Sequence, residues 1–489
     1  MEGAAFDRFV STKKHTFYNF VGGVVSLGVL LISVPLYLQL IGMERYGVLS
    51  ILWLLFGYFG FFDFGIGRAI AHKIAGLSAE GTDKKIDVLW AGLIVNLFLA
   101  AFGAFFLYFA LGYVLTYWIN IGAGLQEEVR ASVLWVSLSL IPSIASSALN
   151  GVVLGRQKFL LLNIVDVAGK LLLQLLPLAT AYFFSPDLES ITQAVLVARL
   201  LAFLFWVIAS RKALHGSMLP RWKPDVARTL WKYGSWITLG MLLAPLLSGV
   251  ERLVIGYLRD ASFVALYAVP FSLVAPVALL SASLSNALFP RFAAEGKHDV
   301  QQLAMNAELV VAILVTPILV VVAFLVYPFT AIWIDVEFAR NTVGVAQLLI
   351  VGFWANSLAK VFHTKLQGEG RPKVIVWVHL TELIPFLVVL YLMTSYWGIL
   401  GAAAAWSIRS VADMLLLGNK SGAWVFPRGY ILTGFGLVTT AAAASSILVF
   451  DVALFVVAGV FLFLTSLLWS WRLGLKGYVL SLMPRAWRK

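Results

Sequence analysis

The sequence has no cysteine and few charged residues. Because Cys is absent from all 489 residues, disulfides, thiol nucleophiles and cysteine zinc sites are excluded. Charged residues make up 12% of the chain and hydrophobic residues 61%, with a mean hydropathy of +0.92. Soluble globular proteins of this length are not so apolar, so the composition indicates a polytopic membrane protein.

Motifs for nucleotide, metal or hydrolytic chemistry are also missing from the sequence. No glycine-rich loop ends in Lys-Ser/Thr, and Gly368-Glu-Gly-Arg-Pro-Lys373 is a turn with a basic edge. The six histidines form no cluster with metal-ligand spacing, and no Ser/His/Asp or paired-carboxylate arrangement stands out. We therefore expect a non-enzymatic protein without cofactor or metal, in which any uphill work comes from ions or from metabolic pull.

The formal charge of +12 raises the question of a nucleic-acid partner, but the distribution of the basic residues argues against one. The chain has no dense Lys/Arg run and no soluble domain that could hold a duplex. The basic excess instead indicates membrane topology and a cationic interior, so we expect the lipid bilayer and no nucleic acid as partner.

Apolar runs predict about fourteen transmembrane helices, since about 20 residues are needed to cross a bilayer. The predicted spans are 17–41, 46–70, 88–117, 131–154, 160–184, 191–210, 233–258, 263–290, 305–334, 342–367, 374–396, 399–418, 429–450 and 452–471. A polar N-terminus precedes the first span without a small-residue cleavage site, which indicates an uncleaved anchor.

The basic residues of the connections predict the orientation. With these limits, 26 Lys and Arg residues lie on one side, and four lie on the other, namely Arg45, Arg130, Arg259 and Arg340. The positive-inside rule therefore places both termini in the cytoplasm of a multi-pass protein. The outer connections are short, so a catalytic domain has nowhere to fold.

The longest connection divides the chain into two similar halves. We expect an N-terminal six-helix lobe over 1–210, a basic cytoplasmic linker over 211–232 and a C-terminal six-helix lobe over 233–418. Residues 419–489 add two helices and a cytoplasmic tail. Three local similarities recur between the halves at nearly one offset: Arg156 with Arg371, Tyr46 with Tyr267, and Arg199 with Arg409. Because six spans is an even number, the lobes would be related by a pseudo-twofold axis along the membrane normal, with a binding site between them.

Two arginines lie near the middle of predicted spans. Arg409 lies within 398–418, with Asp413 one turn later, and Arg199 lies within 191–209 without an acid nearby. An ionised residue at that depth costs roughly 2.5–3.5 kcal/mol, so it should face the bundle interior or a wet cavity. Arg199 and Arg409 are thus candidate substrate-binding residues, with a local Arg409–Asp413 pair as the structural alternative.

Other ionisable residues within spans are further candidates. Asp166 and Lys170 have the spacing of a neutralised helical pair, although Lys170 could also bind substrate. Glu251 and Arg252 are about 100° apart on a helix, so one should face the cavity and the other a neighbouring helix. Lys360 has no acid within a turn, which makes it a cavity candidate.

Acidic residues are candidates for gating or ion coupling. Asp63 lies in the glycine-rich end of the second span, where it serves either a cytoplasmic gate or local structure. Glu251, Glu382 and Asp413 are the other candidates. His379 and Glu382, at i and i+3, form either a proton relay or a hydrogen-bonded helix contact.

These motifs together resemble the Wzx-type oligosaccharide flippases, within the multidrug/oligosaccharidyl-lipid/polysaccharide exporters. The resemblance covers nearly the whole chain, and its most specific part runs from Gly370 to Asp413. It rests on Gly42-x-x-x-Tyr46-Gly47, Asp63-Phe-Gly65-Ile-Gly67, Gly249-Val-Glu-Arg252, Leu288-Phe-Pro290, Gly370-Arg-Pro-Lys373, His379-x-x-Glu382, Gly398-Ile-Leu-Gly401 and Trp406-x-x-Arg409-x-x-x-Asp413. The family often has Asp-Arg where this chain has Glu251-Arg252.

The resemblance implies two six-helix lobes around a central cavity in the bacterial inner membrane. It implies the transfer of undecaprenyl-diphosphate-linked oligosaccharides from the cytoplasmic to the periplasmic leaflet, with a polysaccharide polymerase and a chain-length regulator as candidate partners. Arg199, Arg252, Lys360 and Arg409 would offer cations for the diphosphate.

Three alternatives stay open from the sequence. A lipid II flippase fits the span count and the basic cavity. A cation-coupled multidrug exporter would need a more acidic interior, and a glycan polymerase or ligase would need a long outer loop.

Overall fold

The computed structural model describes residues 2–77, 81–214, 219–231, 247, 249–294, 297–422, 429–448 and 451–475. All regular elements in these ranges are helical, as the sequence predicts. The longer helices up to residue 214 are α1 (Glu2–Phe59), α2 (Ile66–Gly76), α3 (Thr82–Tyr113), α4 (Gln126–Gly155), α5 (Phe159–Phe183) and α6 (Leu188–Leu214). Those that follow are α9 (Val250–Leu258), α10 (Ala261–Val274), α11 (Ala278–Ala294), α12 (Lys297–Trp333), α13 (Val336–Gly368), α14 (Pro372–Ser421), α15 (Gly429–Leu448) and α16 (Val452–Ser470).

Eleven helical segments within the described ranges are long and apolar enough to cross a membrane. A helix satisfies its own backbone hydrogen bonds, which an irregular segment in hydrocarbon cannot do. Many of these helices are apolar on their outer faces as well, and α3 exposes Phe98, Phe102, Phe105 and Phe109. Exposed aromatic faces of this kind are favourable where a helix contacts lipid instead of water. The prediction of an all-α polytopic membrane protein is therefore confirmed.

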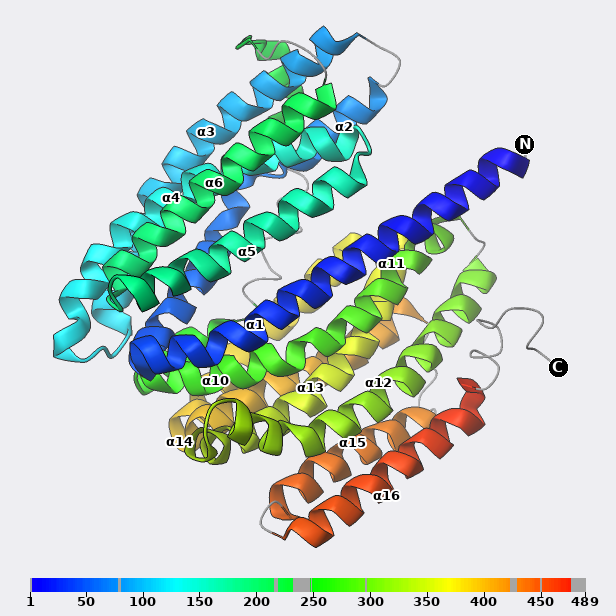
Figure 1. The fold of residues 1–489 in the computed structure, drawn as a ribbon. Coiled ribbons are helices and arrows are strands. Elements are labelled where there is room, and N and C mark those ends of the chain that lie inside the picture. The colour runs from blue at the N-terminus through cyan, green and yellow to red at the C-terminus, as the bar shows by residue number, and fades with distance from the viewer. Residues whose placement is uncertain are drawn as a thin grey trace. The chain divides into compact units, whose positions relative to one another are not determined.

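The chain divides into two compact units, residues 1–262 and 263–489. In unit 1, α4 packs against α2, α3 and α6, and α5 packs against α6 and α1. Figure 1 shows α3, α4, α6 and α5 running side by side. The core of this unit contains small and branched side chains such as Ile70, Ala148 and Val152, so the helices approach closely.

Two breaks shape the first part of unit 1. At Gly42, with φ 80°, α1 turns back on itself, so that Tyr37 lies 6.3 Å from Trp53, ring centroid to ring centroid. The predicted span 46–70 is not continuous, since residues Gly60–Asp63 form a 3-10 turn and α2 starts after Gly65. Phe64 and Gly65 adopt left-handed backbone conformations, which end the helix there.

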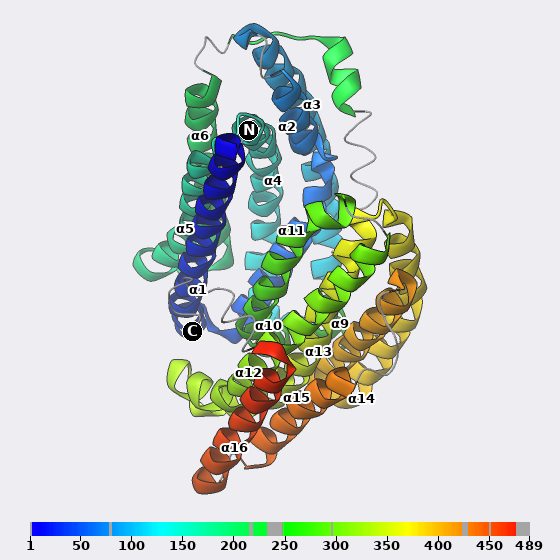
Figure 2. The same ribbon diagram turned by 90° about the vertical axis from the view of Figure 1, so that its right-hand side faces the viewer.

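In unit 2, α13 lies in the middle. It packs against α11, α12 and α14, whereas α12 also packs against α15 and α16. The most apolar window of α13 is 72% buried, against 11% for α16. Figure 2 shows α15 (orange) and α16 (red) beside α12. The two last helices therefore form an outer layer of unit 2.

The helix α14 is a hairpin with two antiparallel halves. The break lies at Gly398, with φ 59° and ψ −135°. Gly401 lets the halves approach, since a Cβ there would lie 1.8 Å from the Met393 carbonyl oxygen. This hairpin brings residues near 380 against residues near 410, which positions the ionisable side chains of unit 2.

The predicted count of fourteen spans agrees with this arrangement. Two of the eleven candidates, in α1 and α14, are each split by a glycine and hold two predicted spans. The seventh predicted span, 233–258, is described only at 247 and 249–258, and the C-terminal tail beyond 475 lies outside the described residues. The division of lobes at 211–232 stays a prediction, because 215–218 and 232 are not described either.

Candidate functional site

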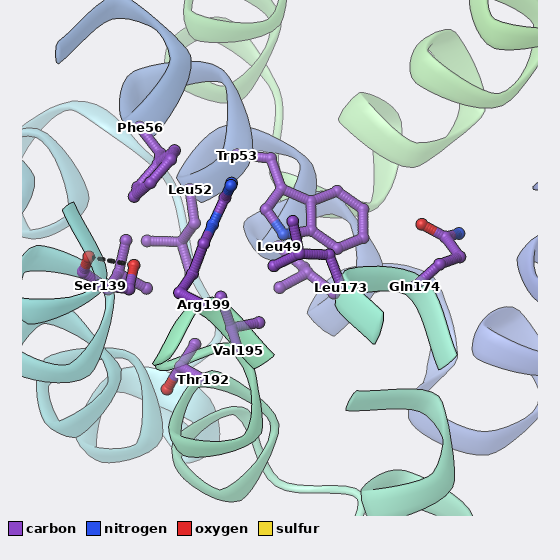
Figure 3. A pocket seen from close by; sticks show the side chains of 11 residues that line it. Leu49, Leu52, Trp53, Phe56, Ser139, Leu173, Gln174, Thr192, Val195 and Arg199 are labelled. Atoms are coloured by element: carbon purple, nitrogen blue, oxygen red, sulfur yellow. Dashed lines mark hydrogen bonds between the residues drawn. The ribbon is translucent and has the colours of Figure 1, made fainter. Parts of the chain in front are cut away.

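Arg199 lies in a cavity of unit 1 that is enclosed by membrane-spanning helices. The cavity has a volume of about 100 Å³. Figure 3 shows the guanidinium group of Arg199, from α6, rising between Phe56 and Trp53 of α1. The polar groups of its wall are few, namely Ser139, Gln174, Thr192 and the arginine itself. A single cation thus stands in an otherwise largely apolar cavity.

Among the described residues, the guanidinium of Arg199 contacts an aromatic ring and forms no ion pair with an acid. Its Cζ lies 4.6 Å from the centroid of the Phe56 ring, a cation–π distance. Its buried Nε has no hydrogen-bond partner among the described residues. An arginine has five N–H donors in a fork that matches a carboxylate or phosphate. The side chain therefore keeps donors available for an anionic ligand.

The cavity wall beside Arg199 is fixed by polar contacts between α5 and α1. Gln174 Nε2 donates to Ser33 Oγ at 2.5 Å, and the Tyr37 hydroxyl donates to the Gln174 carbonyl oxygen at 3.1 Å. Both Ser33 and Tyr37 are fully buried. These bonds hold α5 against the first half of α1 and so position one side of the cavity.

Arg199 lies on α6, and two acids anchor the N-terminal end of this helix. Asp187 accepts from the Ser190 amide at 2.7 Å, and Glu128 accepts from the Leu188 amide at 3.2 Å. Glu128 also receives two hydrogen bonds from Arg45, of 2.6 and 2.9 Å. Although partial burial alone would raise the pKa of Asp187, hydrogen bonds from Ser185 and Ser190 lower it below its usual value. The N-terminus of α6 is therefore capped by an ionised acid.

Lys170 is paired within its own helix. Its Nζ lies 2.7 Å from Asp166 Oδ2, and both side chains are about half exposed. The pair predicted from the i,i+4 spacing is thus confirmed. Lys170 does not line the Arg199 cavity, so a role in substrate binding stays a prediction.

Glu251 and Arg252 lie side by side on α9, but they differ in burial. Glu251 is fully buried, whereas Arg252 is half-buried and donates from Nη1 to Ser50 Oγ at 3.0 Å. Arg252 therefore contacts the second half of α1 within unit 1.

Asp63 is tied into a buried polar cluster with Asn96 and Ser147. It accepts from Asn96 Nδ2 at 2.9 Å and from the Ser147 hydroxyl. Asn96 is fully buried and also donates to the Ile144 carbonyl oxygen at 3.1 Å. The cluster joins the turn before α2 to α3 and α4, so its contacts support a structural role. A role in gating stays a prediction.

In unit 2 the two halves of α14 bring four ionisable residues together, the α14 cluster of His379, Glu382, Arg409 and Asp413. Arg409 Nη1 lies 3.9 Å from Glu382 Oε2, and His379 Nε2 lies 3.6 Å from Asp413 Oδ1. Glu382, Arg409 and Asp413 are each less than 9% exposed. The local pairing of Arg409 with Asp413, an alternative from the sequence, gives way to pairing across the hairpin.

Aromatic rings and a second helix surround the α14 cluster. Arg409 Cζ lies 5.5 Å from the centroid of the Phe386 ring and 6.0 Å from that of Trp406. On α13, the His363 ring stacks on that of His379, with centroids 6.2 Å apart. Lys360 lies one turn before His363 and is half-buried. Lys360 therefore lies on the same helix as the histidine that stacks on the α14 cluster, and a role in substrate binding stays a prediction.

Sequence reasoning missed several residues of these sites. Asn96 and Gln174 are single polar residues in apolar runs, and that isolation is the available signal, whereas Ser147 follows Ser146 and does not stand out. Phe56 has no such signal. Within the described ranges, no group of three or more His, Asp or Glu side chains could hold a metal ion.

Comparisons with known proteins identify the family. Residues 39–342 match the model of the polysaccharide biosynthesis protein family. A Shigella flexneri protein assigned as an O-antigen transporter is 24% identical over 422 residues, which cover 86% of this chain and 98% of that protein.

Solved structures show the same fold. The lipid II flippase MurJ in an inward closed conformation aligns with a TM-score of 0.67 at 13% identity, covering 92% of this chain and 97% of that one. An inward-facing multidrug resistance transporter of the MATE family aligns with a TM-score of 0.65 at 12% identity, covering 86% and 99%. The chain therefore belongs to the polysaccharide biosynthesis protein family, as a membrane transporter of the Wzx type.

Proposed function

We propose that the protein moves undecaprenyl-diphosphate-linked oligosaccharide repeat units from the cytoplasmic to the periplasmic leaflet of the bacterial inner membrane. It does so by alternating access through a cationic cavity, without catalysing a chemical reaction. A diphosphate with a hydrated glycan cannot cross hydrocarbon unaided, because burying charged and polar groups without partners is costly. The transporter must therefore supply hydrogen-bond donors and charges for the diphosphate and the glycan as they cross the membrane.

The observation that carries this proposal is the cavity around Arg199. A cation with available donors, surrounded by membrane-spanning helices, suits the diphosphate, since arginine binds phosphate through two parallel hydrogen bonds. The family and the O-antigen transporter relative support the same class of substrate. Arg252, Lys360 and Lys170 would be secondary contacts, and Arg409 would bind substrate only when it leaves Glu382.

The proposal includes the topology and the pathway partners. Both termini would be cytoplasmic, with a polymerase and a chain-length regulator acting on the exported units. Reporter fusions at Lys489 and within 211–232 should behave as cytoplasmic, and one within 119–129 as periplasmic. An exported C-terminus would contradict this topology.

Deletion in the native host tests the function itself. Lipid-linked repeat units should accumulate in the inner leaflet, and the surface polysaccharide should disappear while peptidoglycan synthesis continues. Arrest of peptidoglycan synthesis would instead support lipid II as substrate. Unchanged surface polysaccharide would contradict the proposal.

A further inference from the structure

A long apolar groove runs along unit 2, between α13, the second half of α14 and α15, and has a volume of about 710 Å³. Its lining residues all belong to unit 2, whereas the Arg199 cavity belongs to unit 1. We propose that this groove binds one acyl chain of a membrane phospholipid, whose phosphate group binds Arg340 at the mouth of the groove. The inference rests on the proposed function only for its topology, which makes the leaflet concerned the periplasmic one.

The groove exists because one of the three helices packs against the other two, which diverge. α13 packs against both α14 and α15, whereas within the described ranges α14 and α15 scarcely contact each other. At one end, α13 and α14 approach closely, since a Cβ added to Gly344 would lie 2.8 Å from Leu400 Cδ2. Toward the other end, the rings of Trp354 on α13 and Phe435 on α15 have centroids 5.7 Å apart. α13 is therefore the floor of the groove, and α14 and α15 are its walls.

The few polar side chains that line the groove already have partners inside the protein. Ser407 donates to a carbonyl oxygen of α13 at 2.7 Å, and Thr439 and Ser446 donate to carbonyl oxygens of their own helix at 2.9 and 3.0 Å. The amide of Gln347 donates to a carbonyl oxygen of α12 at 2.7 Å, and its Oε1 is buried without a partner among the described residues. The groove therefore offers a ligand mainly apolar surface, which suits hydrocarbon and not a glycan or an ion.

The length of the groove matches one leaflet of a bilayer. Leu400 and Val411 on α14 are eleven positions apart, and so are Phe435 and Ser446 on α15. At about 1.5 Å per residue, each wall is about 16 Å long. The hydrocarbon core of a bilayer is about 30 Å thick, so one leaflet contributes about 15 Å. The groove therefore has the length of an acyl chain of one leaflet, whereas an undecaprenyl chain is much longer.

A cation and an aromatic ring mark the mouth of the groove. Arg340 is exposed and lies one turn before Gly344 on α13, which is about 6 Å beyond the end of the groove. Trp397 is 63% exposed and directly precedes the break in α14 at Gly398, close to Leu400. Tryptophan is enriched where the membrane meets water, and a guanidinium binds phosphate through two parallel hydrogen bonds. A headgroup phosphate at this level would therefore meet a cation while its acyl chain enters the groove.

Hydrocarbon suits the groove better than water or empty space. A water molecule needs two to four polar partners, which the groove does not offer. An empty groove would lose the dispersion contacts of the side chains that line it. An acyl chain in the groove would contact three helices, whereas a lipid on the outer face of one helix contacts only that face. We therefore expect the bound chain to exchange more slowly than the lipids around the protein.

Photo-crosslinking of the purified full-length protein tests the site. The protein is reconstituted in phosphatidylcholine vesicles that contain phosphatidylglycerol with a diazirine in one acyl chain, and the labelled peptides are mapped by mass spectrometry. Labelling should be several-fold higher within 400–411 and 435–446 than on the exposed face of α16 around Val457. Equal labelling of the groove and of α16 would show ordinary contact with surrounding lipid and overturns the proposal.

Variants separate the acyl chain from the headgroup. Ala443→Trp and Ile408→Trp each place an indole in the groove at an exposed position, one from each wall, and should reduce labelling there several-fold. Arg340→Gln should also reduce it, because the phosphate loses its cation. The controls are Val457→Trp on α16 and Arg130→Gln on α4, both at exposed positions outside the groove, and they should retain the labelling of the wild type. Unchanged labelling in both groove tryptophan variants, or in Arg340→Gln, overturns the proposal.

Competition identifies the kind of lipid. Excess undecaprenyl phosphate without a diazirine should leave the labelling of the groove unchanged. Loss of labelling would identify a polyprenyl chain as the occupant and overturn the assignment to a phospholipid. Labelling needs no transport, so flipping is measured separately on the same vesicles. Absence of flipping together with the expected labelling contradicts the proposed function and supports the lipid site.

Discussion

Arg409 lies 3.9 Å from Glu382 on the opposite half of α14, and in the described structure no ion pair joins it to Asp413, one turn away on its own half. Both partners are buried. The arginine for which the sequence offers Asp413 as a local partner is therefore paired with Glu382 across the hairpin. Arg409 thus has an acidic partner, whereas Arg199 contacts the ring of Phe56, and we expect the two arginines to play different roles.

Arg409→Ala should destabilise the protein, because it leaves Glu382 as a buried acid without its cation. Breaking one side of a buried ion pair costs about 3–5 kcal/mol. Membrane abundance should fall, and so should the midpoint temperature of thermal unfolding of the purified protein. The control is Arg221→Ala, since Arg221 forms an exposed pair with Asp83 worth about 0–1 kcal/mol.

Arg409→Ala combined with Glu382→Ala should recover much of the lost stability, because the stranded charge is then gone. A double variant as unstable as the single one would show that the ion pair does not account for the loss.

Arg199→Ala should abolish transport while abundance stays normal, because no acid among the described residues pairs with Arg199. Arg199→Lys should retain part of the activity, since a lysine supplies the charge without the fork of donors. Lys170→Ala, at the exposed pair with Asp166, serves as the matched control and should have a smaller effect. Export is measured as surface polysaccharide per molecule of transporter. Normal export by Arg199→Ala would show that transport does not depend on the Arg199 cavity.

Asn96→Leu should destabilise unit 1 by about 1–3 kcal/mol, because Asp63 loses a buried donor. Asn163→Leu is the matched control, since Asn163 is half-buried and donates only to the Phe159 carbonyl within its own helix. The two variants are compared by the midpoint temperature of their thermal unfolding. If Asn96→Leu is as stable as the control and loses transport, Asp63 acts as a gate rather than in structure.

Gly401→Ala should disrupt the α14 hairpin, because the added Cβ would collide with the Met393 carbonyl oxygen. Gly436→Ala on α15 is the control, since a Cβ there meets nothing within 4 Å and alanine is favoured in helices by up to about 1 kcal/mol. Abundance in the membrane should fall for the first variant only. Equal abundance of both would show that the halves of α14 can separate without loss of stability.

Features set by local spacing could be predicted from the sequence. The apolar runs predict the membrane helices, and the i,i+4 spacing predicts the pair of Asp166 with Lys170. The lack of an acid near Arg199 in its own span predicts a cation without a local partner, and among the described residues its buried Nε has no hydrogen-bond partner. These signals depend only on residues within one or two turns of a helix.

Features set by contacts between distant residues could not be predicted. The pairing of Arg409 with Glu382 depends on the register of the α14 hairpin, which is fixed by Gly398 and the close contact at Gly401. The spacing of Arg409 and Asp413 favoured a local pair instead. Likewise, nothing in the sequence indicates that Phe56 lies against Arg199.

The central claim is that this protein alone moves a diphosphate-linked oligosaccharide across the bilayer through the Arg199 cavity. The most direct measurement reconstitutes the purified protein in liposomes with undecaprenyl-diphosphate-linked oligosaccharide and no nucleotide, and follows the arrival of the glycan in the opposite leaflet. We predict flipping by the wild type, loss of flipping in Arg199→Ala and little flipping of lipid II. Dependence on ATP, or equal flipping by wild type and Arg199→Ala, would contradict the account.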